Sequence, residues 1–324
     1  MGEFESIRNI RAQFASLVDQ NMEGIGDDCA TIMGSDLSQL FTTDILVEGI
    51  HFLRDKISPY DLGRKSLSVS LSDIAAMGGT AQSSFLSVAL PPTISSDWYD
   101  SFIEGYRSVS VEYSVPLLGG DPSRSLRDSV INVLVTGTVP ESCRKCRKSG
   151  IAGDLIFVGS TLGNAACGLK LRLTSDAIYD HEQSKFLLQA QDNPRPQMAL
   201  GKYLSQRSEV HAMMDVSDGI ASDLLHILEE SNVGAEIQLE KVPLSSEMVA
   251  VCQANGWSPQ ALALEGGEDY CLLFTAKTDI SDDIFVHTGE KVYCIGRLTD
   301  RIGQIEWLLN NVPQQNEFKG FTHF

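Results

Sequence analysis

Short apolar runs alternate with amphipathic helical patterns along most of this 324-residue chain. Runs of strand length and patterns with a period near 3.6 together predict sheets layered against helices. The polar, basic segment Glu141–Gly153 interrupts the alternation. A chain of this length also divides more naturally into two domains than one. We therefore predict two mixed α/β (α+β) domains, residues 1–140 and 141–324.

The apolar runs that indicate strands are short and occur in both halves. They are Leu40–Thr43, Phe85–Leu90, Val115–Leu118, Val130–Val139, Leu155–Val158, Met213–Val216, Ala235–Leu239, Tyr270–Thr275 and Val292–Ile295. Helical spacing of Ile7, Ile10 and Phe14 predicts an opening amphipathic helix. Ser58 followed by Pro59 is typical of a helix start, and this helix is expected to end near residues 77–79. Further helices are predicted over 97–113, 196–207, 220–230 and 245–255.

The chain is strongly acidic, with 25 basic and 43 acidic residues and a formal net charge of −18. This charge would repel nucleic acid and anionic membranes, so neither is expected as a partner. No run approaches the ~20 apolar residues that span a bilayer, and the charged N-terminus lacks a signal core. The odd count of 7 cysteines suits a reducing compartment, and we expect a cytoplasmic protein. A phosphate ester would also be repelled, so such a ligand must bring cations.

Acidic residues recur beside glycine or where apolar runs end. The segments are Gly24–Asp28, Thr42–Asp44, Leu71–Asp73, Gly119–Asp121, Asp215–Gly219 and Gly266–Asp269. Glycine permits positive φ and close backbone approach, so a neighbouring carboxylate is free to point into a cleft. Mg²⁺ prefers such oxygen ligands. Because one such segment alone is an ordinary turn signal, the prediction of a metal site depends on the whole set.

Convergence of these carboxylates would need cations, since each desolvated charge costs several kcal/mol when it is left unpaired. The set therefore predicts a polynuclear Mg²⁺ site, and the alternative is that the segments are separate surface turns. Asp218 has a second interpretation, because it precedes the helical pattern that starts at Ile220 and would cap that helix.

The usual phosphate-binding signatures are missing from the sequence. Gly163–Lys170 begins like a P-loop, but its lysine comes one residue late and Leu171 replaces the hydroxyl residue. The motifs of protein kinases and the serine hydrolase elbow are also not found. Phosphate binding in this chain is therefore expected to depend on metal ions and backbone groups.

The acidic segments together resemble the thiamine-monophosphate kinase family in order and spacing. The resemblance is carried by Gly26–Ala30, Thr43–Phe52, Leu71–Gly78, Gly119–Asp121, Met214–Gly219, Gly266–Tyr270 and the terminal Gly320–Phe324. It covers nearly the entire chain. The Asp44–His51 segment and the C-terminal ending distinguish this family from its relatives, which include aminoimidazole ribonucleotide synthetase and selenophosphate synthetase.

The resemblance implies direct transfer of the γ-phosphoryl group of ATP to thiamine monophosphate, giving thiamine diphosphate without a phosphoenzyme. It implies Mg²⁺ ions held by Asp28, Thr43, Asp44, Asp73, Asp121, Asp215 and Asp218. It implies contacts to ATP from Gly120, Asp121, Lys148 and Ser217, and an acceptor site lined by His51, Glu268 and Phe321. Without the resemblance, His51 would more simply be a packed histidine. These roles fit a reaction that needs positioning and charge neutralisation more than a strong base.

The resemblance also implies a homodimer in which two N-terminal sheets close a β-barrel and the C-terminal domain closes over ATP. Two departures from the family pattern affect individual residues. Where the family usually has Arg-Ser-Gly, this chain has Arg147-Lys148-Ser149-Gly150, so the register places the phosphate-contacting cation on Lys148, with Arg147 as the alternative. Phe321 stands where the family often has Tyr or Trp, so stacking is kept and a hydroxyl contact is lost.

Two other functions are compatible with the residues. A synthetase of the same superfamily would need a nucleophile-handling residue in the glycine-rich N-terminal region, where Cys29 lies. An acidic divalent-cation-binding protein without turnover would need only the carboxylates. Cys143 and Cys146 supply two of the four ligands of a structural zinc, and with no second pair nearby we interpret them as part of a surface turn.

Overall fold

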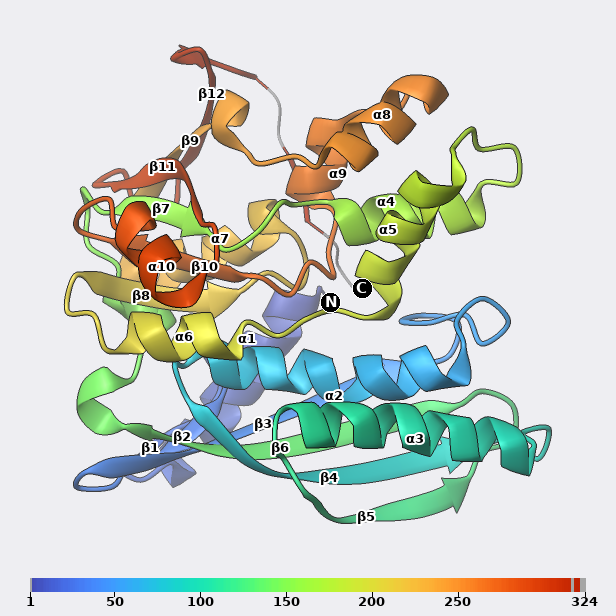
Figure 1. Ribbon diagram of the computed structural model, residues 1–324. Helices are drawn as coiled ribbons and strands as arrows, with labels where there is room; N and C mark the ends of the chain where they lie inside the picture. Colours follow the sequence, from blue (N-terminus) through green and yellow to red (C-terminus); the bar gives the residue numbers. More distant parts are fainter. Residues whose placement is uncertain (1, 316–317, 321–324) are drawn as a thin grey trace.

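Two sheets, each layered against helices, make up the computed structural model, which describes residues 2–315 and 318–320. Helix α2 (Pro59–Ala76) lies between the two layered units (Figure 1). The prediction of a mixed α/β chain with two sheet-containing domains is thereby confirmed.

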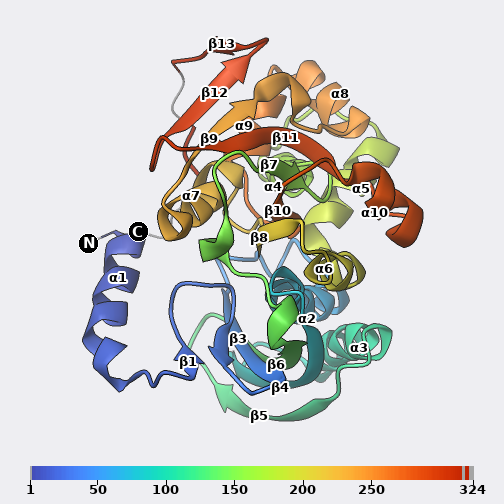
Figure 2. The ribbon, with the colours of Figure 1, turned by 90° about the vertical axis from the view of Figure 1, so that its left-hand side faces the viewer.

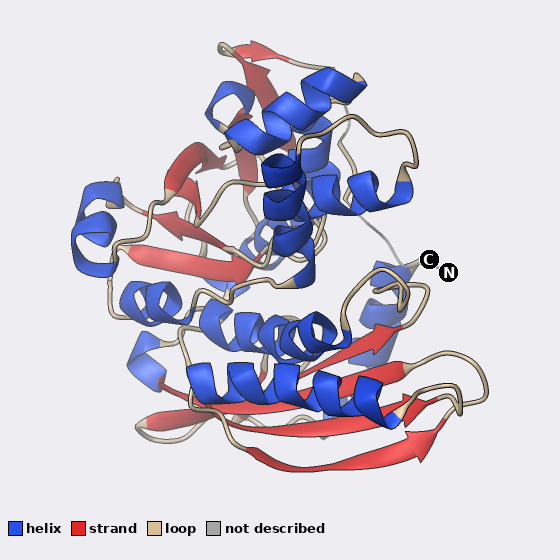
Figure 3. Ribbon diagram, turned by 45° about the vertical axis from the view of Figure 1, so that its right-hand side comes forward, coloured by secondary structure: helices blue, strands red, loops and turns tan. Residues whose placement is uncertain are grey.

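The N-terminal sheet has six strands in the order β1-β2-β3-β6-β4-β5, antiparallel except for the pair β4 and β5. The strands are β1 (Met22–Glu23), β2 (Ala30–Ile32), β3 (Leu37–Val47), β4 (Thr80–Leu90), β5 (Leu117–Arg124) and β6 (Val130–Pro140). Buried residues alternate with partly exposed ones along β6, as expected when one face is covered. Helices α2 and α3 (Ser96–Glu112) cover that face, and the other face carries no helix of the described chain (Figure 3).

Within the described residues, the C-terminal sheet has seven strands in the order β13-β12-β9-β11-β7-β10-β8, of which only β12 and β9 pair in parallel. The strands are β7 (Leu155–Val158), β8 (Val210–Asp215), β9 (Gly234–Gln238), β10 (Leu272–Ala276), β11 (Tyr293–Thr299), β12 (Ile305–Leu309) and β13 (Val312–Pro313). The helices are α4 (Asn164–Leu173), α5 (His181–Asp192), α6 (Met198–Ser205), α7 (Ile220–Ser231), α8 (Ser246–Asn255), α9 (Pro259–Glu265) and α10 (Ser281–Thr288). Two separate apolar clusters pack on this sheet, so helices cover both of its faces.

Helix α2 begins and ends where the sequence predicts. The Ser58 hydroxyl accepts a hydrogen bond from the Asp61 amide at 3.0 Å, and Pro59 occupies the first turn. After α2, Gly78 has φ +68°, and a Cβ atom there would lie 2.3 Å from the Ser205 side chain, so the close approach of α6 requires glycine. The helix packs into the N-terminal core with Leu62, Leu67, Leu71 and Ile74 and into a C-terminal core with Ala75 and Ala76. Side chains of α2 therefore contact both halves of the chain.

The sequence predictions agree best with the structure for helices and strands that are buried. The strand predicted over Leu155–Val158 coincides with β7, and the helix predicted from Ile220 is α7. The strand predicted at Val115–Leu118 lies instead at Leu117–Arg124, because β5 is an exposed edge strand and no apolar run marks it. The short strands β1, β2, β12 and β13 and the helices α4, α5, α9 and α10 are additional to the prediction.

The polar segment between β6 and β7 forms the 3₁₀ turns η2 (Glu141–Cys143) and η3 (Arg147–Ser149). The predicted opening helix is α1 (Glu3–Phe14), followed by the turn η1 (Ala15–Leu17). Figure 2 shows α1 beside the layered units and near α7, where the Arg11 guanidinium contacts the Glu230 carboxylate at 2.5 Å. Within the described residues, no helix is both long enough and apolar enough to span a bilayer.

Candidate active site at the domain junction

Three carboxylates from distant parts of the sequence meet where the two halves of the chain join. Asp28 follows β1, Asp73 lies on α2, and Asp215 ends β8. One carboxylate oxygen from each lies within 4.8 Å of the others. For these three residues, the alternative of separate surface turns is therefore wrong.

Asp44 on β3 lies on the same side of the sheet as this group. The Ser70 hydroxyl of α2 donates a hydrogen bond to Asp44 Oδ2 at 2.6 Å, and the Thr42 hydroxyl donates to Asp73 Oδ2. Burial raises the pKa of Asp44 above its ordinary value. Burial and then the charge of Asp44 hold the pKa of Asp73 well above its ordinary value. Asp44 is thus an electrostatic neighbour of the three grouped carboxylates.

The site contains more negative charge than its own cations balance. Burial, followed by the charge of Asp28, raises the pKa of Asp215 to about 7. Arg147 pairs with the group, and its Nη2 lies 2.6 Å from Asp28 Oδ1. Carboxylate and hydroxyl oxygens are the ligands that hard divalent cations take, and such ions would relieve this repulsion. The donor set therefore fits Mg²⁺.

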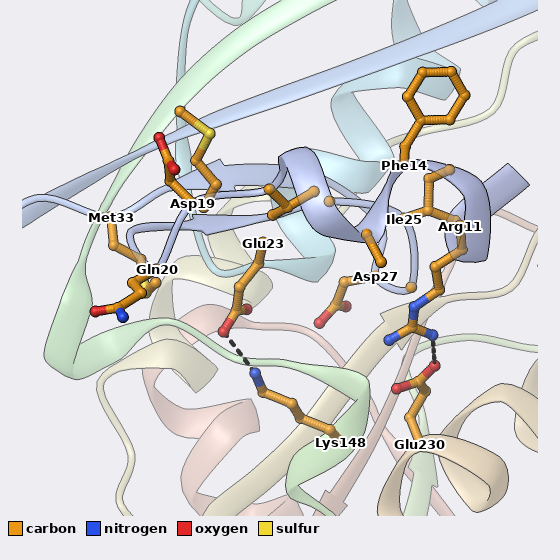
Figure 4. Close-up of a pocket in the computed structure, with 15 residues that line it drawn as sticks. Arg11, Phe14, Asp19, Gln20, Glu23, Ile25, Asp27, Met33, Lys148 and Glu230 are labelled. Atoms are coloured by element: carbon orange, nitrogen blue, oxygen red, sulfur yellow. Dashed lines mark hydrogen bonds and ion pairs between the residues drawn. The ribbon is translucent and has the colours of Figure 1, made fainter.

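Arg147 and Lys148, the two alternatives for the cation that contacts the ATP phosphates, have different surroundings. Arg147 is largely buried against Asp27 and Asp28. The Lys148 side chain is 51% exposed, and its Nζ lies 2.6 Å from Glu23 Oε1. Figure 4 shows this Lys148–Glu23 contact in a hollow of about 470 Å³ beneath α1. Arg147 therefore pairs with the acidic group, and Lys148 lies outside it.

A cavity of about 620 Å³ opens beside Asp44 between the two halves of the chain. Its polar lining includes Thr43, Asp44, His51, Lys65, Ser217, Asp218 and Glu268. Its apolar lining includes Ile45, Leu46, Ile50, Phe52, Leu53, Ile57, Val69, Leu169 and Leu173. A ligand in this cavity would meet carboxylates and an apolar wall together, which suits a molecule that carries both a phosphate and an aromatic ring.

The backbone around Glu268 is held in an uncommon conformation. Glu268 has φ +68° and Tyr270 has φ +45°, and such left-handed residues cost about 1–3 kcal/mol each. The loop is fixed by hydrogen bonds from the Glu268 amide to the Ser217 carbonyl at 2.7 Å and from the Tyr270 amide to the Val216 carbonyl at 2.8 Å. Two loops of the acidic pattern, 215–219 and 266–269, therefore support each other at the cavity.

Asp218 lies one residue before the N-cap of the helix that follows it. Gly219 is the N-cap of α7, and the Asp223 carboxylate accepts hydrogen bonds from the amides of Ser217 and Asp218 at 3.0 and 3.1 Å. Asp223 lies in the first turn of α7, within reach of the loop that precedes the helix. The N-cap position itself belongs to Gly219, and the side chain of Asp218 is among those that line the cavity.

His51 follows β3 in the turn after Val47. The Val47 amide donates a hydrogen bond to His51 Nδ1 at 3.0 Å, so the neutral ring carries its proton on Nε2. His51 also lines the cavity, so it is more than a packed histidine of the core.

Gly120 and Asp121 are not brought to the acidic group within one chain. All of β5 is exposed, and neither residue lines the cavity. The strand register aligns Asp121 with Ser87, Asn132 and Ile45, which places it on the open face of the sheet, whereas Asp44 faces α2. Phe321 lies outside the described residues.

The cysteines offer no reactive group at this site. Cys29 is 1% exposed, and burial, followed by the charge of Asp73, raises the pKa of its thiol well above the ordinary value. A neutral, buried thiol does not suit the nucleophile that a synthetase would need. Cys146 is buried and accepts a hydrogen bond from Arg144 at 2.9 Å, so the expectation of a surface turn is wrong for this residue. Its apolar surroundings in the core cause that burial.

Lys65 is a cavity residue that the sequence prediction missed. It lines the cavity from α2, and its Nζ lies 2.5 Å from Glu268 Oε1. Its sequence signal was its position between Leu62 and Val69 on a buried stripe of the helix, where a lysine is unusual.

The chain combines two layered sheets with a cluster of carboxylates at their junction. Comparisons with known protein families identify the class of protein that has this arrangement. Residues 26–139 match the family described as "AIR synthase related protein, N-terminal domain". Residues 152–307 match "AIR synthase related protein, C-terminal domain". The chain is therefore a member of the AIR synthase related class in both halves.

Individual relatives narrow this class. The chain is 36% identical to thiamine-monophosphate kinase of Haemophilus influenzae, covering 100% of this chain and 98% of the relative. It is 35% identical to the enzyme of that name from Escherichia coli strain K12, covering 93% and 91%. The solved structure "AaThiL complexed with AMPPCP and TMP" matches with a TM-score of 0.87 at 31% identity, covering 100% of this chain and 97% of that one. The chain belongs to the thiamine-monophosphate kinase family.

Proposed function

We propose that this chain transfers the γ-phosphoryl group of ATP to thiamine monophosphate, giving ADP and thiamine diphosphate. One observation carries the proposal: the same cavity is lined by carboxylates of the acidic segments and by an apolar wall. The names of the relatives and the ligands of the AaThiL structure support the same reaction. As a kinase of this type, the chain would work in the cytoplasm, where ATP is available.

Mg²⁺ is the cation that the donor set fits. The residues that would hold it are Asp28, Thr43, Asp44, Asp73, Asp121, Asp215 and Asp218. When bound, Mg²⁺ would neutralise the ATP phosphates and orient the γ-phosphoryl group. The chain itself orients these ligands, because the hydroxyls of Ser70 and Thr42 donate to two of the carboxylates.

The acceptor needs no strong base. A phosphate monoester is largely dianionic near pH 7, so one of its oxygens can attack the γ-phosphorus while the bond to the β-phosphate oxygen breaks and ADP leaves. His51 and Glu268 line the cavity where the acceptor would lie, and Phe321 is proposed to stack on its ring. The chain would thus act mainly by placing two phosphates in line and excluding water from them.

Lys148 remains our candidate for the cation that contacts ATP. Its flexible, half-exposed side chain is held by one surface ion pair with Glu23, which contributes little to stability. Arg147, in contrast, is already committed to Asp28 as a buried counter-charge. Ser217 and the backbone at Gly120 and Asp121 complete the proposed ATP contacts.

A homodimer would explain the open face of the N-terminal sheet. That face exposes Ile45 and Phe85, and the edge strand β5 exposes Leu117 and Leu118. Asp121 also lies on this face, as does Thr43, whose hydroxyl accepts a hydrogen bond from the Asn132 side chain. We propose that a second copy covers the face and closes a β-barrel across the twofold axis. Light scattering that shows a stable monomer of about 35 kDa would contradict this part.

The decisive assay is incubation with ATP, Mg²⁺ and thiamine monophosphate, followed by chromatography for thiamine diphosphate. Thiamine serves as the control acceptor. Phosphorylation of thiamine but not of its phosphate would overturn the proposal. Binding of ATP and Mg²⁺ in a calorimeter without formation of ADP would favour the cation-binding protein without turnover.

A further inference from the structure

Lys65 is a buried cation whose contacts join three parts of the chain. Its side chain is 1% exposed, although lysine is almost never fully buried unless it is paired. Its Nζ donates a hydrogen bond to the Gln191 carbonyl at 3.1 Å and lies 2.5 Å from Glu268 Oε1. Gln191 lies in the last turn of α5, where carbonyls lack helical partners. Lys65 thus connects α2 of the N-terminal half to α5 and to the 266–269 loop.

Glu268 is the more exposed member of this pair. Its side chain is 25% exposed and lines the cavity, whereas Lys65 lies behind it. Its backbone is in the left-handed region, so its side-chain direction depends on contacts that hold the loop. A carboxylate has two acceptor oxygens, so an ammonium on Oε1 leaves the group able to accept a further hydrogen bond. Lys65 can therefore fix the carboxylate without using all of its capacity to bind a ligand.

We infer that Lys65 is a positioning residue, which holds the Glu268 carboxylate at the cavity and thereby sets the affinity for the cationic heterocycle of the acceptor. This inference rests on the proposed function and assigns a role within the same site. The thiazolium ring of a thiamine ester is positively charged and its aminopyrimidine ring donates hydrogen bonds, so a fixed carboxylate is a suitable partner. Lys65 acts through Glu268 and contacts no reacting atom.

The main test replaces Lys65 with methionine, which keeps the length of the side chain and removes its charge. Loss of one charge-assisted hydrogen bond predicts a rise in KM for thiamine monophosphate of about 10- to 100-fold. The KM for ATP should change less than about threefold, because the variant removes no contact to ATP. Thiamine, which lacks the phosphate, should lose affinity as a competitive inhibitor by the same factor. A loss confined to thiamine monophosphate would mean that Lys65 contacts the phosphate, and would overturn the inference.

The matched control is Lys145, the other buried lysine at the junction. Its Nζ donates hydrogen bonds to the carbonyls of Arg207 and Val210 at 2.8 and 2.7 Å, and it does not line the cavity. Lys145→Met should lower the melting temperature and leave both KM values near those of the wild type. If Lys145→Met raises the KM for the acceptor as much as Lys65→Met does, the effect is general loosening of the junction and the inference fails.

A double variant keeps the test informative if Lys65→Met does not fold. Glu268→Gln combined with Lys65→Met removes both charges, so no unpaired buried charge remains. If Lys65 acts through Glu268, the double variant should have the acceptor KM of Glu268→Gln alone. A further rise in KM would overturn the inference.

Wild-type turnover separates the two levels of the proposal. If the wild type forms no thiamine diphosphate, the proposed function fails and the role of Lys65 fails with it. If the wild type is active and folded Lys65→Met has an unchanged KM for the acceptor, only the role of Lys65 is overturned.

Discussion

Replacing Asp215 with asparagine should stabilise the metal-free protein while it removes kinase activity. The Asp215 side chain is buried, with 3% of the residue exposed. One of its carboxylate oxygens lies within 4.8 Å of a carboxylate oxygen of Asp28 and of Asp73. Burial and the charge of Asp28 raise its pKa to about 7. Asparagine has nearly the same shape and volume as aspartate, so the packing around the side chain is kept. The change therefore removes charge repulsion with little loss of packing.

The size and sign of the effect follow from the pKa. The folded state binds the proton of Asp215 more tightly than the unfolded chain, where the ordinary value is 3.8. Stability of the metal-free protein should therefore fall as the pH rises from about 4 to about 7 and then level off. At pH 8 the full difference corresponds to about 4 kcal/mol. Because asparagine also loses the attraction to Arg147, we expect a net gain of about 1–3 kcal/mol, or about 2–4 °C in Tm for each kcal/mol.

Calorimetry in chelator at pH 8 measures this gain directly. At pH 5 the gain should shrink by roughly half, because much of the repulsion is already relieved by protonation in the wild type. With Mg²⁺ present the order should reverse, since the wild type gains binding energy that the variant cannot. Asp154→Asn is the control: Asp154 is equally buried but pairs with His211 at 2.8 Å, so this change should lower Tm. A lower Tm for Asp215→Asn in chelator at pH 8 would refute the reasoning.

The remaining predictions concern roles at the same site. Asp44→Asn should reduce kcat by at least about 100-fold, a loss typical of removing transition-state charge stabilisation, with a small change in Tm in chelator; a collapsed Tm with normal activity per folded molecule would make Asp44 structural. Cys29→Ser should keep kcat within about threefold, because the buried thiol has no chemical role, and loss of turnover in a folded variant would revive the synthetase alternative. Lys148→Met should raise the KM for ATP by about 3- to 10-fold without lowering Tm, whereas Arg147→Met should lower Tm by leaving Asp28 unpaired; equal KM values for Lys148→Met and the wild type would exclude Lys148.

Local signals in the sequence predict two kinds of element: those stabilised by contacts within one turn, and those buried on both sides. The Ser58-Pro59 start of α2 is an example, because the cap and the proline act within one turn. Strand β7 is buried on both sides, so its apolar run is continuous and easy to find. Strand β5 is exposed throughout and contains glycine and proline, so its position is set by pairing with β4 and not by its own residues.

The kind of ligand could be predicted from the sequence, but not the distances. Aspartate beside glycine indicates oxygen ligands, and the structure brings Asp28, Asp73 and Asp215 together from positions nearly 190 residues apart along the chain. Lys65 was missed because a lysine in a helix is usually solvated, and its burial depends on α5 and the 266–269 loop. Asp121 lies on the open face of its sheet, on an edge strand that is exposed throughout.

The negative charge of the chain and the acidic site together affect how it would select its nucleotide. A net charge of −18 repels free ATP, and the grouped carboxylates bring further negative charge to the place where the phosphates would bind. Arg147, the cation paired with Asp28, is buried and already neutralised, so it adds little attraction. ATP that arrives with Mg²⁺ would instead relieve the repulsion among Asp28, Asp73 and Asp215 as it binds. The carboxylate cluster would therefore discriminate against free nucleotide, because only the Mg²⁺ complex of ATP is attracted by the negative charge of the cluster.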